Sequence, residues 1–391
     1  MKLLTLSNLY PNEAQPRHGI FTEHRMSNML KSRRVEIKVV APVPYFPFKG
    51  SIFGKYSTGA KIPRSARRNG IDVIYPRYPT IPKLGMNLQP LLLAAAMIRP
   101  LKKLIRSGYD FDVIDAYYFY PEGVAAALLG RFFGKPVVIT AYGNDISLIP
   151  RYALPKRMIQ WAANEASGIT TVCQALKDAL LDLGADGEKV HVVLHGVDLK
   201  LFRLPDNREE ARKKLGLTRR SLLTAGHLIE RKGHHIAIQA LVNLPDTDLL
   251  IAGDGEEEQN LRRLAASLGV ADRVRFLGHV DQRDLPTIYG ATDALLLPSS
   301  REGIANVLVE SLACGNPVVA TNVWGAPEVI TVPEAGVLMK SRAPEALVDA
   351  VEQLFGAYPD RAETRRFAEQ FTWERTTEQH LALLDEIVSR G

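Results

Sequence analysis

Short apolar runs rich in β-branched residues recur along the chain, separated by stretches with helical spacing, and they fall into two successive sets. The runs are apolar throughout instead of alternating, which is typical of strands buried on both faces in a parallel sheet covered by helices. Two such sets predict an α/β protein with two doubly wound, Rossmann-like domains. The first set contains "KLLTLSNLY", "VEIKVVAP", "DVIYPRYP", "DVIDAYY", "KPVVITAYG", "GITTVC" and "VHVVLHG", and the second contains "RSLLTAGH", "TDLLIAGDG", "DRVRFLGHV", "DALLLPSS" and "NPVVATN".

The two sets meet at "HGVDLKLFRLPDN" (195–207), where a strand gives way to polar residues and proline. We therefore expect an N-terminal domain over 1–195 and a C-terminal domain over 196–371. Apolar residues at helical spacing predict a final helix within 372–391, able to pack on either domain. Ligands of open α/β sheets bind beyond the carboxyl ends of the strands, so the loops that follow the strands are the candidate sites.

Basic residues are concentrated in the first part of the chain. Residues 1–110 contain 19 Lys and Arg against 5 Asp and Glu, a net charge of +14, whereas the whole chain carries +6. The clusters "KIPRSARRNG" and "RPLKKLIRSG" are not interleaved with stacking aromatics, so we do not expect a nucleic acid partner. An anionic membrane surface or a phosphate-bearing acceptor suits these cations, and a solvated basic face is the alternative.

Cysteine usage and hydropathy favour a cytoplasmic protein. Cys173 and Cys314 lie far apart among apolar or small neighbours, which is typical of reduced core thiols. The first residues alternate like a strand and do not resemble a signal peptide. The longest apolar run, "LLLAAAMI" (91–98), is far shorter than the ~20 residues that span a bilayer. Peripheral contact with the inner face of the membrane and the oligomeric state are left open.

Two glutamates, Glu302 and Glu310, flank the start of a predicted helix in "SSREGIANVLVESLACGNPVVAT" (299–321). An apolar stripe at helical spacing begins at Ala305, Glu310 lies off that stripe, and Asn306 can cap the first turn. A helix N-terminus favours phosphate, and Glu310 lies roughly 7 Å further along the axis. The pair could hold a nucleotide sugar, with the sugar on Glu302, the diphosphate between and the ribose on Glu310. Two ordinary solvated acids are the alternative.

Two cations, Arg231 and Lys232, lie beside a second helix start in "LLTAGHLIERKGHHIAIQAL" (222–241). The pattern indicates a strand, a loop containing Gly226 and a helix that begins near Gly233. Such cations suit a diphosphate, because each charge-assisted hydrogen bond contributes ~1.5–3 kcal/mol. They would also stabilise the charge on a departing diphosphate. A solvated basic turn is the alternative.

Gly19 follows the first predicted strand and opens a predicted helix, where a missing side chain lets backbone N–H groups approach a ligand closely. Metal chemistry has little support. The Asp-x-Asp pairs at 110–112 and 246–248 precede strands, and the adjacent His234 and His235 have no obvious partner ligands. We expect no metal site and no cofactor.

These motifs, together with "FLGHVDQRDLPTIYGATDALLLPSS" and "VLHGVDLKLF", resemble the family 4 glycosyltransferases of the GT-B fold. The resemblance spans almost the whole chain and rests on the Glu-x7-Glu element and the basic loop, which occur in the family's order. It implies two Rossmann-like domains facing across a cleft and a C-terminal domain that binds the nucleotide sugar. It further implies an acceptor site mainly on the N-terminal domain, a last helix that crosses back onto that domain, and metal-independent transfer with retention.

The resemblance also implies roles for individual residues. Glu302 would contact the sugar hydroxyls and Glu310 the ribose, while Arg231 and Lys232 would hold the diphosphate. Gly19 would approach the phosphate from the other domain, Gly226 belongs to the donor loop, and the segment from Gly278 to Val280 would meet the base. Backbone N–H groups near the sugar and phosphate would come from Gly303, Ile304, Ala305 and Asn306.

The sequence departs from the family pattern in "DVIDAYYFYPEG", where Tyr117 replaces the histidine that relatives place beside the donor sugar. The resemblance would make Tyr117 a catalytic residue, and a phenol can still donate a hydrogen bond but cannot be cationic. Smaller departures are His195 for the usual Asn and Tyr142 for a basic residue or His.

The leading hypothesis is a retaining hexosyltransferase that uses a nucleotide diphosphate sugar, with a UDP-sugar as the first candidate donor. The acceptor would be a glycan or polyprenyl-linked sugar in cell-surface polysaccharide synthesis. One alternative is a GT-B nucleotide-sugar epimerase, which would not need the basic N-terminal half. Another is a non-catalytic nucleotide-sugar-binding subunit, suggested by Tyr117.

Overall fold

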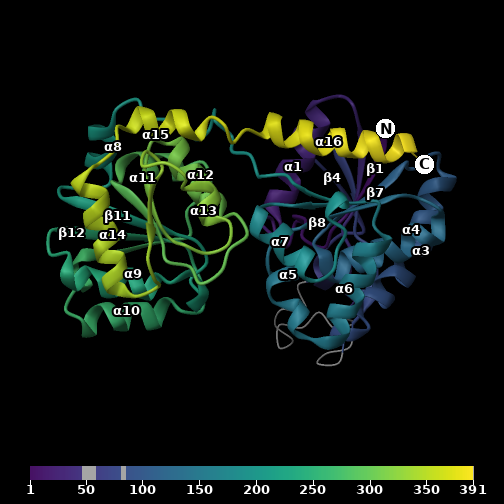
Figure 1. Ribbon diagram of the computed structural model, residues 1–391, viewed down its shortest axis with the longest axis horizontal. Coiled ribbons are helices and arrows are strands. Elements are labelled where there is room, and N and C mark those ends of the chain that lie inside the picture. The colour runs from purple at the N-terminus through teal and green to yellow at the C-terminus, as the bar shows by residue number, and fades with distance from the viewer. Residues whose placement is uncertain (46–58, 81–84, 391) are drawn as a thin grey trace. The chain divides into compact units, whose positions relative to one another are not determined.

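The computed structural model describes residues 1–45, 59–80 and 85–390, and the chain divides into two compact units. Unit 1 comprises Met1–Leu194 together with Glu374–Gly391, and unit 2 comprises His195–Trp373. Each unit is built on its own largely parallel sheet flanked by helices (Figure 1). The fold class predicted from the two sets of apolar runs is confirmed.

Unit 1 contains a large sheet and a separate two-stranded one. Its strands are β1 (Lys2–Leu6), β2 (Glu36–Val40), β3 (Val43–Tyr45), β4 (Ser65–Arg68), β5 (Ile71–Ile74), β6 (Arg77–Pro79), β7 (Val113–Tyr117), β8 (Val137–Ala141), β9 (Gly168–Thr171) and β10 (Val190–Val192). The large sheet has the order β10-β9-β8-β7-β1-β2-β5-β4, and only the pairing of β4 with β5 is antiparallel. The carboxyl ends of β1, β7 and β8 therefore lie side by side.

Helices cover both faces of the large sheet of unit 1. They are α1 (Ile20–Lys31), α3 (Gln89–Arg106), α4 (Val124–Phe133), α5 (Asn144–Ser147), α6 (Ala153–Glu165), α7 (Gln174–Asp182) and α16 (Trp373–Arg390). One face packs against α1 and α16, which contribute Met26, Met29, Leu381 and Leu384 to a core shared with the strands. The helices α3, α4 and α6 pack together elsewhere on the unit (Figure 1).

The final helix, α16, is thus part of the N-terminal unit. Its apolar residues Leu381, Leu384 and Ile387 are buried in the same core as Leu3 and Val39, which lie far away in sequence. This is the helical stripe that the sequence shows in 372–391. At the surface Arg34 forms ion pairs with acids of α16, which at exposed positions contribute little. Burial of the apolar stripe therefore holds the helix in place.

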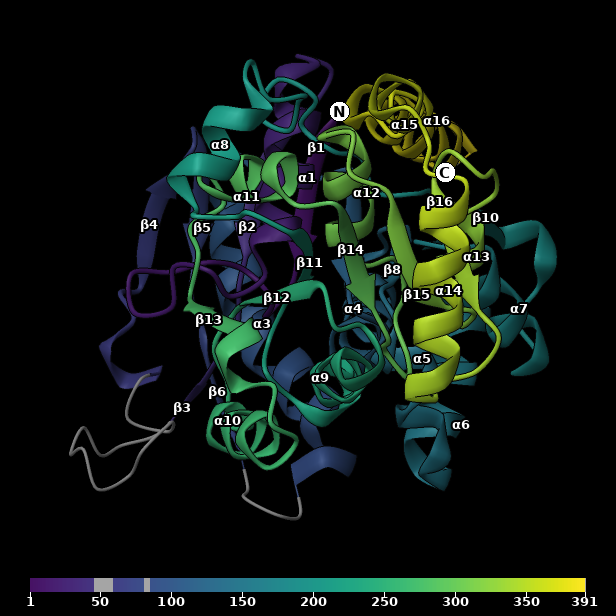
Figure 2. The same ribbon diagram turned by 90° about the vertical axis from the view of Figure 1, so that its left-hand side faces the viewer.

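Unit 2 is a six-stranded, fully parallel sheet with the order β13-β12-β11-β14-β15-β16 (Figure 2). Its strands are β11 (Arg220–Ala225), β12 (Thr247–Ala252), β13 (Val274–Gly278), β14 (Ala294–Leu297), β15 (Val318–Thr321) and β16 (Gly336–Met339). The order reverses between β11 and β14, so the loops after these two strands diverge at a switch point of the sheet. Ligands of doubly wound sheets bind at such a point.

The helices of unit 2 are α8 (Arg208–Lys214), α9 (His234–Ala240), α10 (Glu258–Ser267), α11 (Leu285–Ala291), α12 (Asn306–Ala313), α13 (Ala326–Val329), α14 (Pro344–Gly356) and α15 (Arg361–Ala368). Apolar residues of α9, α10 and α14 form one core with the strands, including Ile236, Leu261 and Leu347. The helices α8, α11, α12 and α15 pack on one another in the other layer (Figure 1). The switch-point loops enter α9 and α12, which belong to different layers.

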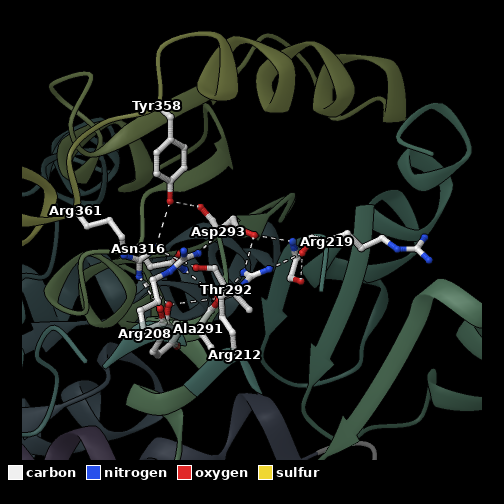
Figure 3. Close-up of polar contacts among 12 residues, drawn as sticks. Arg208, Arg212, Arg219, Ala291, Thr292, Asp293, Asn316, Tyr358 and Arg361 are labelled. Carbon is white, nitrogen blue, oxygen red and sulfur yellow. Dashed lines mark hydrogen bonds and ion pairs between the residues drawn. The ribbon is translucent and has the colours of Figure 1, made fainter. Parts of the chain in front are cut away.

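The amino end of β14 is fixed by Asp293, whose polar contacts are drawn in Figure 3. Its carboxylate pairs with Arg208 and Arg212 of α8 and accepts the backbone N–H of Ser221 at 2.8 Å. Its carbonyl accepts the hydroxyl of Tyr358 at 2.8 Å. Asp293 therefore joins α8, β11 and the segment after α14 at the amino ends of the strands, opposite the switch-point loops.

Three short strands were not among the apolar runs. The edge strand β4 is "SARR", whose cations gave only a charge signal, and β16 is an edge strand of four residues that starts at Gly336. The strand β3 includes Pro44. Edge strands carry less apolar sequence because one side stays open. Within the described ranges, no helix has the length and apolar character needed to traverse a bilayer.

Candidate active site

The two cations and the first glutamate predicted from sequence come together at the switch point of unit 2. Arg231 and Lys232 lie in a 3₁₀ turn between β11 and α9, and Glu302 lies in the loop between β14 and α12. Lys232 Nζ is 2.7 Å and Arg231 Nη1 is 3.3 Å from Glu302 Oε1. The carboxylate is 11% exposed, so these charges interact in a partly desolvated site.

The pair of cations decides the charge of Glu302. Burial alone would raise the pKa of this carboxyl, but the positive charges of Lys232 and Arg231 outweigh burial and lower the pKa below its ordinary value. Glu302 is therefore ionised at neutral pH. An ionised carboxylate is a strong acceptor for hydroxyl groups, which is the property that a sugar contact requires.

Hydrogen bonds to the backbone hold the basic turn and the loop of Glu302 together. Ser300 N–H donates to Arg231 O at 2.9 Å, and the Arg231 side chain donates back to Arg301 O. Gly233, with φ 74°, packs so closely that a Cβ there would lie 2.1 Å from Pro298 O. Glycine is required at this position for both reasons. The basic turn and the loop of Glu302 consequently form one backbone assembly.

Arg342 braces this assembly and was not anticipated from sequence. It donates to Pro298 O at 3.0 Å and to Glu230 O at 2.8 Å, and it forms an ion pair with the Glu230 carboxylate. The residue follows β16, a strand that the apolar pattern missed, so no local signal marked it. Arg342 links the loops after three strands of the sheet.

The helix predicted after Glu302 is α12. Its stripe residues Ala305, Leu308, Val309, Leu312 and Ala313 are all buried, as the spacing predicts. The expected cap was wrong: Asn306 is the first helical residue, and the N-cap is Ala305, which has no capping side chain. The first N–H groups of α12 have no capping side-chain acceptor and remain available for an anion.

Glu310 differs from the expectation in its surroundings. Although it lies off the apolar stripe, it is only 9% exposed, which excludes an ordinary solvated helix residue. Tyr289 of α11, itself fully buried, donates its hydroxyl to Glu310 Oε2 at 3.2 Å. Burial raises the pKa of Glu310 to about 7, while hydrogen bonds from Tyr289 and Gln282 act in the opposite direction. Neither of these two partners was recognised from the sequence.

The remaining predicted donor positions of unit 2 also lie at this edge of the sheet. Gly226 N–H donates to Ala252 O at 2.9 Å, and Gly253 N–H donates to Gly278 O at 2.7 Å. These bonds tie together the segments that follow β11, β12 and β13. Val280, two positions beyond Gly278, is half-buried in the loop after β13. The Gly303–Asn306 backbone leads from Glu302 into α12, where Gly303 O accepts the N–H of Gly325 at 3.1 Å.

Gly19 belongs to unit 1 and lies beyond the carboxyl end of β1. It is the N-cap of α1, with φ 69°, as the predicted helix start requires. A Cβ at this position would lie 2.1 Å from the backbone carbon of Leu9. Glycine is thus imposed by a close backbone approach within the unit. A role of Gly19 toward a phosphate stays a prediction.

Tyr117 does not lie at an open edge of unit 1. Its side chain is 0% exposed at the end of β7, and its hydroxyl is 3.4 Å from His380 Nε2 of α16. Arg25 donates to His380 Nδ1 at 2.9 Å, so Nε2 carries the proton and faces Asp115 at 3.1 Å. The catalytic role expected for Tyr117 stays a prediction. Its buried partners come from α1 and α16, and the sequence did not reveal these contacts.

The site of unit 2 combines the ionised carboxylate of Glu302, the cations Arg231 and Lys232, the uncapped N-terminus of α12 and the carboxyl of Glu310, whose pKa is raised. Cations and N–H groups bind phosphate, whereas carboxyl groups bind hydroxyls, so the set matches a sugar joined to a nucleoside through a diphosphate. The described part of the chain contains no cluster of three or more His, Cys, Asp or Glu that could hold a metal ion. This chemistry is what a nucleotide-sugar site requires.

Two family models together match most of the chain. The family model "Glycosyltransferase Family 4" matches residues 21–201, and "Glycosyl transferases group 1" matches residues 207–371. A candidate teichuronic acid biosynthesis glycosyltransferase of Bacillus subtilis, TuaC, is 27% identical over 90% of this chain and 88% of its own. The D-inositol 3-phosphate glycosyltransferase of Mycobacterium tuberculosis is 30% identical over 80% of this chain and 68% of its own.

Solved structures extend the likeness to the whole chain. Sucrose-phosphate synthase of Thermosynechococcus elongatus has a TM-score of 0.82 at 18% identity, and the match covers 100% of this chain and 100% of its own. HepE of Anabaena, in complex with UDP, has a TM-score of 0.75 at 21% identity and covers 99% of this chain and 100% of its own. These identities establish the fold alone, whereas the sequence relatives establish the family. The chain belongs to the family 4 glycosyltransferases and has the GT-B fold.

Proposed function

We propose that the protein transfers a hexose-type sugar, with retention of configuration, from a UDP-sugar to a glycan or polyprenyl-linked acceptor in the synthesis of a cell-surface polysaccharide. The observation that carries the proposal is the contact of Lys232 and Arg231 with Glu302 beside the N-terminus of α12. Two cations of the kind that bind phosphate thus lie next to an ionised carboxylate, which is a good acceptor for sugar hydroxyls. Glu310, in the second turn of the same helix, supplies a carboxyl for a ribose.

Relatives support the choice of donor and acceptor class. HepE, which has the same fold, was solved in complex with UDP and with UDP-glucose. TuaC is named for the biosynthesis of teichuronic acid, a polysaccharide of the kind proposed here. The net charge of +14 in residues 1–110 suits an acceptor that carries phosphate or lies at an anionic surface.

The proposed reaction needs no protein base. The bond between the anomeric carbon and the diphosphate oxygen breaks, and the acceptor oxygen forms its bond to the same face of that carbon. The departing diphosphate takes the acceptor proton, while Arg231 and Lys232 stabilise the negative charge that develops on it. Because two cations and the helix N-terminus already provide positive charge, the proposal requires no metal ion.

A donor panel tests the function. The full chain is incubated with UDP-, GDP- and ADP-sugars, with and without a chelator, and release of the nucleoside diphosphate and the anomeric configuration of the product are measured. UDP release that survives chelation and gives a retained product is expected. Turnover only with another nucleotide, or only with added metal, contradicts the corresponding part of the proposal.

Tyr117→His is assayed on the same panel to separate the enzyme from a non-catalytic binding subunit. Because Tyr117 is enclosed by Arg25, His380 and Asp115, we expect the substitution to give no gain in turnover. If the wild type binds the donor without turnover and Tyr117→His gains turnover, the natural chain is a binding subunit.

An anionic membrane surface is the proposed site of action, because the α3 and α6 regions of unit 1 carry both exposed apolar and exposed basic side chains. Leu88 and Leu91 lie at the start of α3, and Tyr152 and Leu154 lie at the start of α6. The hydroxyl of Tyr120 contacts both Met86 and Met158, which keeps these two helix starts together. Exposed cations accompany them at Arg99, Lys102, Lys103, Arg151, Lys156 and Arg157.

Vesicle sedimentation tests the membrane surface. Binding is expected on vesicles that contain phosphatidylglycerol and should fade as salt is raised, because the attraction is screened. Leu91→Ser with Leu154→Ser, or Lys102→Glu with Arg157→Glu, should weaken binding, whereas the exposed Lys213→Glu of unit 2 should change it least. Equal binding to neutral phosphatidylcholine vesicles contradicts the proposal.

A further inference from the structure

The two glutamates of the Glu-x7-Glu element differ in the charge of their partners. Glu302 contacts two cations, whereas no Lys, Arg or His among the described residues forms an ion pair with Glu310. The partners of Glu310 are uncharged: the phenol of Tyr289 at 3.2 Å and the amide of Gln282. A buried carboxylate without a cation is costly, so its charge depends on such hydrogen bonds.

The partners of Glu310 come from two different segments. Tyr289 lies in α11, and Gln282 lies in the turn that precedes α11 and follows the Gly278–Val280 loop. Both are donors, and neither neutralises the carboxylate. On its own helix Glu310 faces the thiol of Cys314, whose pKa is raised to about 12 by burial and by the Glu310 charge. Arg361 and Arg365 of α15 act on that thiol, whereas the pKa of the Glu310 carboxyl is set by burial and by the hydrogen bonds from Tyr289 and Gln282.

A ribose presents two adjacent hydroxyls, which donate together to the two oxygens of an ionised carboxylate. A protonated carboxyl keeps one good acceptor and turns the other oxygen into a donor, so the paired contact is lost. Resting on the proposed nucleotide-sugar function, we propose that Tyr289 and Gln282 are positioning residues that hold Glu310 ionised for a ribose, and that a proton on Glu310 competes with the nucleotide. The enzyme's affinity for its donor then rises with pH across the neutral range.

The direction of the pH dependence follows from the pKa of Glu310. Burial raises this pKa to about 7, so the carboxyl is largely protonated at lower pH and ionised at higher pH. If the ribose binds only the ionised form, affinity falls about tenfold for each pH unit below that pKa. Tyr289 acts to lower the pKa, so its removal must move the dependence to higher pH. Loss of one hydrogen bond of ~0.5–1.5 kcal/mol lowers the ionised fraction at a pH equal to the pKa, and with it the affinity, roughly two- to sevenfold.

The test uses UDP-glucose, whose diphosphate is esterified at both ends and does not titrate in this range, with calorimetry from about pH 6 to pH 9. Wild-type affinity should rise roughly tenfold or more and then level off. Tyr289→Phe should bind roughly two- to sevenfold more weakly at pH 7 and recover at high pH, and Gln282→Met should behave alike. Glu310→Gln should remove the pH dependence. Tyr358→Phe, which removes another hydroxyl of unit 2, is the matched control.

A ligand-free measurement keeps the result independent of the donor. The carboxyl carbon of Glu310, labelled with carbon-13 and assigned through Glu310→Gln, should titrate near neutrality and at higher pH in Tyr289→Phe. Titration in the ordinary range of a glutamate, or a pH-independent affinity in the wild type, overturns the proposal. A Tyr289→Phe defect equal at every pH would make Tyr289 merely structural. Absence of UDP-glucose binding with a neutral titration would instead count against the proposed donor.

Discussion

Lys232 Nζ lies 2.7 Å from Glu302 Oε1, although the two residues follow different strands of the sheet. The lysine and the glutamate therefore neutralise part of each other's charge. In the proposed reaction a diphosphate on the cations would compete with the carboxylate for them, which would leave Glu302 available to a sugar hydroxyl. Donor binding would thus exchange the cation partners of Glu302 for a sugar hydroxyl.

Glu302→Ala should abolish transfer while leaving the binding of UDP intact. The variant removes the acceptor for the sugar hydroxyls but keeps both cations, so we expect kcat/KM to fall at least about a hundredfold, equivalent to ~2.7 kcal/mol. UDP affinity by calorimetry should stay within a few fold. Glu345→Ala, at an exposed position on α14, is the control. Wild-type rates in Glu302→Ala would refute the assignment of Glu302 as the sugar contact.

Lys232→Met should change the pH profile of the reaction as well as donor affinity. Lys232 is the strongest of the groups that lower the pKa of Glu302, so its removal lets burial raise that pKa. Glu302 is protonated below its pKa, and the acid limb of kcat/KM should therefore move to higher pH. The exposed Lys200→Met should leave the limb in place. An unchanged acid limb in Lys232→Met would show that the pair does not control Glu302.

Asp293→Ala should destabilise unit 2 without touching the donor site. The substitution leaves Arg208 and Arg212 without their carboxylate and the N–H of Ser221 without its acceptor. Because these groups are only partly desolvated, we expect a loss of about 2–3 kcal/mol in the free energy of unfolding, measured by urea denaturation. Asp246→Ala, at an exposed position, should be close to neutral. An equal effect of both variants would argue against a special role for the Asp293 contacts.

His380→Gln should alter how stability depends on pH. Burial lowers the pKa of His380, so below about pH 6.5 the unfolded chain takes up a proton that the folded chain resists. The wild type should therefore lose stability as pH falls through that range, and the variant should lose less. His234, with a pKa near 4, contributes the same sign in both proteins. Thermal unfolding from about pH 5 to pH 8 measures the difference, and parallel curves would contradict it.

The same variant should loosen α16. His380 bridges Arg25 and Asp115, and its removal leaves buried polar groups without partners. Amide hydrogen exchange in residues 374–390 should accelerate at neutral pH, whereas exchange in the core strands of unit 2 should not change. Unaltered exchange in α16 would indicate that the apolar stripe alone holds the helix.

Much of the fold follows from apolar pattern, because buried parallel strands must be apolar on both faces. The central strands and the stripe of α12 were predicted for this reason. The edge strands β4 and β16 were not, since "SARR" and a strand opening on Gly336 carry no such pattern. The cap at Asn306 was wrong by one position, because Asn306 is already the first helical residue and Ala305 is the N-cap.

The site was predictable in part, for a physical reason. Charged residues beside helix starts are visible in sequence, so Arg231, Lys232, Glu302 and Glu310 were proposed, and the structure brings the first three together. Long-range partners are not visible, and nothing in "TIYGATDALLL" marks Tyr289 as a partner of Glu310. The enclosure of Tyr117 depends on Arg25 and His380, which lie 355 positions apart. Tertiary contacts of this kind decide whether a residue meets solvent, and no local pattern records them.

The close approach of Gly233 to Pro298 has a consequence for protein engineering. The backbone of the basic turn rests against the backbone that leads to Glu302, so the two loops can be exchanged between relatives only as a pair. A chimaera that imports one loop alone would bring two backbones of different origin into this close contact, and any misfit would displace a cation or the carboxylate. Donor specificity should therefore be transplanted by grafting both loops together, with the glycine included.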